Sequence, residues 1–160
     1  MPKHTFIHDM SRTISLANQY LMMQVEKGAL KGIAPSHGDI LSELFTTDGI
    51  SMSELSQRIL RDPSTVTALV RKLVDMGLVR TKKCSTDKRS VMVYITPYGL
   101  EFKEEFERIS QCLIDTWSEG ISEEDLQAAA RVLQAVNANL HAALERENKQ
   151  GQDRDSGSIA

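Results

Sequence analysis

The segment from Ser51 to Thr96 constrains the fold of this 160-residue chain more than any other. It contains two short amphipathic patterns, each with a helix-start signal: a Ser-x-x-Glu capping box at Ser51 and an Asp-Pro pair at Asp62. Gly77 follows the second pattern, where a helix is expected to end in the left-handed conformation. The expected apolar positions are Leu55, Ile59 and Leu60 in the first helix and Val66, Leu69, Val70, Leu73 and Val74 in the second. Two short helices joined by a tight turn predict a helix-turn-helix.

A basic hairpin is predicted directly after these helices. Residues 78–83 and 90–96 are expected to form strands, separated by a polar tip at residues 84–89 that carries two cations. The exposed side of the second helix is expected to carry the side chains that contact base edges or phosphates of DNA: Ser64, Thr65, Thr67, Ala68, Arg71 and Lys72. Either feature alone is also typical of a solvated surface. Their combination in this order favours a winged helix that binds DNA.

Several short motifs in this segment resemble the DNA-binding region of the MarR family. They are Ser53-Glu54-Leu55-Ser56, Asp62-Pro63-Ser64-Thr65-Val66-Thr67, the run from Leu73 to Arg80, Thr86-Asp87-Lys88-Arg89-Ser90, and Ile95-Thr96-x-x-Gly99. The similarity extends more loosely over residues 5–147, through the lengths and order of the helices. The resemblance implies that Arg89 reaches into a minor groove, that Asp87 orients it through an ion pair, and that Lys88 joins the wing contact.

The charge of the chain is unevenly distributed. Residues 50–97 hold nine Lys and Arg against four Asp and Glu, a net of +5, whereas the remainder holds ten against eighteen, a net of −8. The overall net charge of −3 therefore hides a basic segment that phosphates would attract.

Long amphipathic helices flank the winged segment. Helices are expected at about residues 5–27, 35–47, 97–120 and 122–145, with an apolar residue, Ala34, where the second needs a polar cap. The fold class expected is mainly α with a small β-hairpin wing. Its parts are dimerisation helices at residues 5–34 and 98–147, a winged helix-turn-helix at residues 35–97, and a disordered tail at residues 148–160.

The flanking helices offer more apolar surface than a small winged domain covers. Packing against a second copy would bury it and would present two recognition helices to a pseudo-palindromic DNA site. The alternative is that these helices fold back and complete a monomeric core. The family resemblance favours the homodimer. It also implies a small phenolic or carboxylate effector between the dimer helices and the winged domain, with these candidate lining residues: Tyr20, Met23, His37 and Phe45.

Other chemistry has weaker support in the sequence. His4 and His8 share a helix face but have no third ligand nearby, so neither a metal nor a cofactor is expected. Cys84 lies among lysines that would favour a reactive thiolate, and Cys112 is expected to fill a core position. No phosphate-binding loop or nucleophile elbow indicates an enzyme. No segment indicates a signal peptide or a membrane span, and the two separate cysteines suit a cytoplasmic protein.

The sequence therefore predicts a homodimeric, cytoplasmic regulator of transcription that binds double-stranded DNA, expected to be a repressor released by a ligand. Two alternatives remain open. One is a winged-helix module for protein-protein contact, and the other is a thiol-based redox sensor with the same fold.

Overall fold

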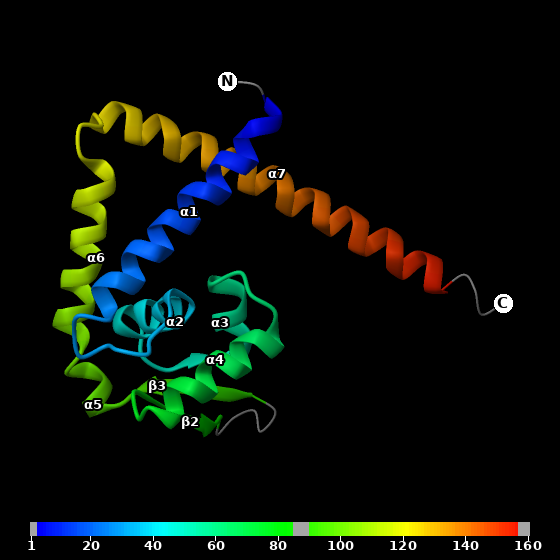
Figure 1. Ribbon diagram of the computed structural model, residues 1–160. Helices are drawn as coiled ribbons and strands as arrows, with labels where there is room; N and C mark the ends of the chain where they lie inside the picture. The colour runs from blue at the N-terminus through cyan, green and yellow to red at the C-terminus, as the bar shows by residue number, and fades with distance from the viewer. Residues whose placement is uncertain (1–2, 85–89, 157–160) are drawn as a thin grey trace. The chain divides into compact units, whose positions relative to one another are not determined.

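The computed structural model describes residues 3–84 and 90–156 and is mainly helical with a small antiparallel sheet, as predicted (Figure 1). Its elements are α1 (Lys3–Val25), α2 (Pro35–Thr46), β1 (Ile50–Ser51), α3 (Met52–Arg58), α4 (Pro63–Asp75), β2 (Val79–Lys83), β3 (Val91–Ile95), α5 (Pro97–Leu100), α6 (Lys103–Ser118) and α7 (Glu123–Ser156). The chain divides into two compact units, Met1–Trp117 and Ser118–Ala160. The first unit contains the helix-turn-helix and the sheet, and the second contains α7.

The first unit has one continuous apolar core. Its fully buried side chains come from α2, α3, α4 and the three strands: Ile40, Leu41, Leu44, Ile50, Leu55, Leu73, Val66, Val79 and Val93. The predicted inner face of α4 is confirmed at Val66, Val70 and Leu73, whereas Val74 at its end is 38% exposed. Burial of this stripe fixes which side of α4 faces outward.

Side-chain caps start both helices of the helix-turn-helix. The Ser51 hydroxyl accepts the backbone N–H of Glu54 at 3.1 Å, but the carboxylate of Glu54 does not complete the predicted capping box. Glu54 instead pairs with Arg58 at 2.6 Å, and the same guanidinium reaches Glu43 of α2 at 2.9 Å. The Asp62 carboxylate accepts the N–H of Thr65 at 2.9 Å, which confirms the predicted start of α4.

The turn between α3 and α4 differs from the prediction. Leu60 was expected on the apolar face of the first helix, but it lies beyond the end of α3, with a φ of 53° and 64% exposure. The N–H of Arg61 bonds to the carbonyl of Ser56 at 3.1 Å, a helix-ending arrangement that requires a left-handed residue at position 60. The end of α4 follows the prediction, with Gly77 at a φ of 74°.

The sheet has the order β1-β3-β2, and all of its pairs are antiparallel. Strand β1 was not predicted; its Ile50 pairs with Val93 across a long separation in sequence. The β2–β3 hairpin confirms the predicted wing strands and pairs Thr81 with Val93. Because side chains alternate along a strand, Thr81 and Lys83 lie on one face of β2.

The helix predicted at residues 97–120 is broken into α5 and α6. The Thr96 hydroxyl accepts the N–H of Gly99 at 2.9 Å and donates to the carbonyl of Gly77 at 2.7 Å, so α5 is tied to the end of α4. At Gly99 an added Cβ would lie 2.1 Å from the carbonyl oxygen of Leu78. This backbone contact holds α5 in place and the chain turns before α6 begins.

The C-terminal helix is longer than expected. Helix α7 runs to Ser156, whereas the sequence predicts its end near residue 145 and a disordered tail at residues 148–160. Residues 146–150 are mostly strong helix formers, which favours continuation past residue 145, whereas helix propensity does not explain the last turns to Ser156. Residues 157–160 lie outside the described part. No helix among the described residues is long and apolar enough to cross a membrane.

Candidate nucleic-acid interface

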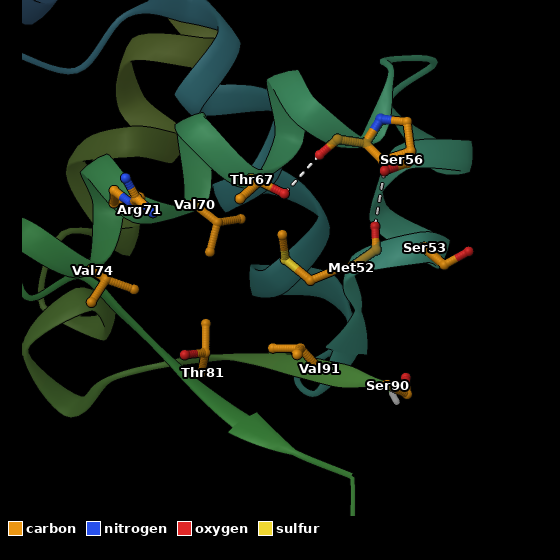
Figure 2. Close-up of a pocket in the computed structure, with 11 residues that line it drawn as sticks. Met52, Ser53, Ser56, Thr67, Val70, Arg71, Val74, Thr81, Ser90 and Val91 are labelled. Atoms are coloured by element: carbon orange, nitrogen blue, oxygen red, sulfur yellow. Dashed lines mark hydrogen bonds between the residues drawn. The ribbon is translucent and has the colours of Figure 1, made fainter. Parts of the chain in front are cut away.

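A hollow of about 570 Å³ lies between the helix-turn-helix and the wing strands (Figure 2). Its lining comes from α3, α4, β2, the first residue of β3 and the residue before it: Met52, Ser53, Ser56, Pro63, Thr67, Val70, Arg71, Val74, Thr81, Ser90 and Val91. Thr67, Arg71 and Val74 are spaced by four and three residues, so one face of α4 borders the hollow. This face is the part of the exposed side of α4 that lies nearest the wing strands.

The residues predicted to contact DNA on α4 lie outside the core. Ser64, Thr67, Ala68, Arg71 and Lys72 are exposed, and Thr65 is half-buried. Arg71 borders the hollow beside the wing strands. Burial lowers the pKa of His37 in α2, and the positive charge of Lys72 lowers it further, so Lys72 lies toward α2. Arg71 and Lys72 therefore lie on different sides of α4.

The hydroxyl groups at the start of α4 are engaged within the helix. Those of Ser64 and Thr65 donate to the carboxylate of Asp62, the latter at 2.5 Å. The Thr67 hydroxyl donates to the carbonyl of Pro63 at 2.7 Å. The hydrogen bonds from Ser64 and Thr65 hold the pKa of Asp62 far below its usual range, so this carboxylate is charged at neutral pH.

The wing residues Asp87, Lys88 and Arg89 lie outside the described residues. The strand leading to them carries exposed cations that sequence reasoning did not include among the contacts. Lys83 shares the face of Thr81, which borders the hollow, whereas Arg80 stacks on the ring of Tyr94 at 4.6 Å. Side chains alternate along β2 from the buried Val79, which places Lys83 and Arg80 on opposite faces. This alternation was the signal in the sequence that could have identified Lys83.

The four predicted effector residues have different surroundings in the structure. Met23 borders a hollow of about 860 Å³, which residues of α2 and Arg61 also line. The Tyr20 hydroxyl accepts a hydrogen bond from Thr116 at 3.1 Å. Phe45 packs on Phe106 with ring centroids 5.3 Å apart. His37 acts as a helix cap: its Nδ1 accepts the N–H of Ala34 at 3.0 Å.

A separate hollow of about 260 Å³ lies between α1, α2 and α6. Most of its lining is apolar and includes Leu21, Val25, Ile33, Phe106, Ile109 and Leu113. Sequence reasoning missed this set because its members come from α1, the loop that follows it, α2 and α6. Cys84 and Cys112 are both half-buried, and no group of three or more metal-ligating side chains occurs within residues 3–84 and 90–156.

Residues 33–91 match the sequence profile of the MarR family. A 90-residue stretch is 32% identical to the HTH-type transcriptional repressor IacR from Pseudomonas putida, covering 56% of this chain and 54% of that protein. The chain thus matches about half the length of this curated relative. A 69-residue stretch is 32% identical to translation initiation factor IF-2 from Streptococcus pneumoniae, where it covers only 7% of that protein.

The fold is similar to those of solved MarR proteins. A MarR protein from Peptoclostridium difficile matches with a TM-score of 0.78 and 20% identity, over 88% of this chain and 90% of that one. A MarR-family regulator from Silicibacter pomeroyi matches with a TM-score of 0.67 and 25% identity, over 81% and 86%. Residues 33–91 thus resemble the MarR family in sequence, and the chain shares the winged-helix fold of solved MarR proteins.

Proposed function

We propose that this protein is a transcriptional regulator that binds a pseudo-palindromic DNA site as a homodimer, through α4 and the wing. The observation that carries the proposal is the outward face of α4, whose exposed Arg71 borders the hollow beside the wing strands. In a helix-turn-helix this face enters the major groove, and the hairpin contacts the flanking DNA.

The contacts have distinct expected roles. Arg71 and Lys72 supply donors to phosphates or to guanine, and Lys83 extends the cationic surface toward the wing tip. The predicted wing contact by Lys88 and Arg89 stays a sequence-based expectation. A module that binds only a protein partner does not need Arg71, Lys72 and Lys83 all exposed, which favours DNA over the protein-protein alternative.

Exposed apolar side chains support a dimer. On α1, Ile7 and Ile14 are 56% and 58% exposed, and their seven-residue spacing places them on the same side of the helix. On α7, Leu133 and Leu140 share this spacing and are 40% and 53% exposed. Large apolar side chains repeated on one helix face are typical of helix-helix association.

We also propose that the protein represses transcription and that a small ligand releases it from DNA. Similarity to a named repressor favours repression. The apolar hollow between α1, α2 and α6 has room for a single-ring compound. We therefore place a phenolic or carboxylate ligand in this hollow rather than against the four residues named from the sequence. A ligand there would alter DNA affinity only through a difference in its affinity for two arrangements of the dimer.

Selection from a random-sequence duplex library tests the proposal. An enriched inverted repeat, with half-sites about one helical turn apart, is the expected result. Adding salicylate as a phenolic carboxylate probe should weaken binding to the selected duplex. Failure to enrich any sequence, with negligible affinity even at low salt, would contradict DNA binding and favour the protein-protein module. If salicylate does not change binding to the enriched duplex, DNA binding stands and only the phenolic or carboxylate effector is contradicted.

A further inference from the structure

The first turn of α4 has a defined hydrogen-bonding polarity. A hydroxyl group carries one proton and two lone pairs, and the protons of Ser64, Thr65 and Thr67 are donated within the protein. The acceptors are the two carboxylate oxygens of Asp62 and the carbonyl oxygen of Pro63. Toward solvent, these hydroxyls therefore present lone pairs only.

An acceptor-only surface discriminates among the groups of DNA. Phosphate oxygens carry no donor at neutral pH, so these hydroxyls form no hydrogen bond with the DNA backbone. In the major groove the donors on base edges are the amino groups of adenine and cytosine, whereas guanine and thymine present a carbonyl oxygen in the corresponding place. The charged carboxylate of Asp62 also disfavours a phosphate close to this turn.

We infer that the first turn of α4 selects adenine or cytosine over guanine or thymine at the base positions beneath it, with Asp62 as the positioning residue. This inference rests on the proposed function and assigns a specificity to the same surface. Asp62 acts through the hydroxyls, because it fixes the direction in which their protons point. Arg71, which carries only donors, supplies the opposite preference one turn further along the helix.

Exchange of Asp62 for Asn tests this role without removing the helix cap. Asn caps helices about as well as Asp, and its oxygen replaces the one that accepts the Thr65 N–H. Its NH₂ group then faces the Thr65 hydroxyl in place of the second carboxylate oxygen. The hydroxyl accepts that hydrogen bond and releases its proton outward. One base position in each half-site should change its preference.

The experiment compares duplex selection by wild-type protein, Asp62→Asn and Asp75→Asn. Asp75 is an exposed acid at the other end of the same helix, so this control matches the change in charge. Wild-type protein and Asp75→Asn should prefer adenine or cytosine at the position by about tenfold over guanine or thymine. Asp62→Asn should lose this preference or reverse it, with an unchanged melting temperature.

A second measurement deletes the donor from the DNA. Replacing the selected adenine by purine, which lacks the exocyclic amino group, should weaken wild-type binding by about tenfold and leave binding by Thr65→Val unchanged. A selected site that is identical for wild-type protein and Asp62→Asn would overturn the inference while leaving DNA binding intact. If the wild-type protein selects no sequence at all, the proposed function itself fails.

Discussion

The Nδ1 atom of His37 accepts the backbone N–H of Ala34 at 3.0 Å, which supplies the N3 half of a capping box at the start of α2, where Ala34 has no polar side chain for the other half. Only neutral imidazole can accept there. Burial, and secondarily the charge of Lys72, lower the pKa of His37, so the folded protein keeps the neutral form to a lower pH than the unfolded chain does.

This shift predicts an acid-sensitive stability. The unfolded chain takes up a proton on His37 below about pH 6.5, while the folded protein does not until the pH falls further. Stability is therefore fully present above about pH 6.5 and declines as the pH falls toward the lowered pKa. Thermal melting of wild-type protein should shift downward between about pH 7.5 and pH 5.5 by more than that of His37→Gln.

The His37→Gln variant serves as the matched control, because Gln at this position can accept the same backbone N–H but does not titrate. The other histidines of the chain, including His8 and His141, are the same in both proteins. Equal pH shifts in the two proteins would contradict the linkage to His37.

Two glycines should respond in opposite directions to Ala. At Gly99 the new Cβ would lie 2.1 Å from the carbonyl oxygen of Leu78, so Gly99→Ala should destabilise the protein by about 1–3 kcal/mol. At Gly38, inside α2, the nearest atom belongs to Phe106 at an ordinary 3.5 Å. Gly38→Ala should therefore stabilise by about 0.5–1 kcal/mol. Urea unfolding measures both, and a stable Gly99→Ala protein would contradict the described contact between α5 and Leu78.

Self-association should depend on the apolar face of α7. Leu140 is 53% exposed, and Leu140→Glu should weaken the dimer by about tenfold or more without loss of helix content. The matched control is Gln134→Glu, which adds the same charge at an exposed polar position of α7. Sedimentation equilibrium gives the dissociation constants. A dimer unaffected by Leu140→Glu would exclude this face from the interface.

At the wing tip, net charge alone and the proposed ion pair predict opposite changes in DNA affinity. Arg89→Ala should weaken DNA binding by about 1–3 kcal/mol with unchanged dimerisation and melting temperature. Asp87→Ala removes a negative charge and would tighten binding if only the net charge mattered. If Asp87 orients Arg89 through an ion pair, the variant binds more weakly instead. Tighter binding by Asp87→Ala would remove the proposed pair.

Local signals were sufficient to predict the helix-turn-helix. Asp62 caps α4 and Gly77 ends it because both effects depend on neighbours within one turn. Strand β1 was missed because Ile50 is held by Val93, which is distant in sequence. The break between α5 and α6 was also missed. Helix α5 is held against Leu78 through Thr96 and Gly99, a contact that periodicity along one helix does not reveal.

The candidate site was predictable in its composition but not in its geometry. Helical periodicity placed Ser64 and Arg71 on the outer side of α4, as the structure shows. The direction of each hydroxyl proton depends on side-chain rotamers, which periodicity does not determine. The capping role of His37 was not predicted, because Glu and Gln are the usual residues at its capping position.

Whether α4 is the DNA-binding helix is tested by the salt dependence of binding to the selected duplex, measured for wild-type protein, Arg71→Ala and Lys31→Ala. Lys31 is an exposed cation in the loop before α2, so its loss controls for net charge. If Arg71 contacts a phosphate, its variant should bind about tenfold more weakly, with a slope of log affinity against log salt reduced by about 0.9. Lys31→Ala should match the wild-type protein. Equal affinities and slopes for Arg71→Ala and the wild-type protein would contradict the assignment of α4 as the DNA-binding helix.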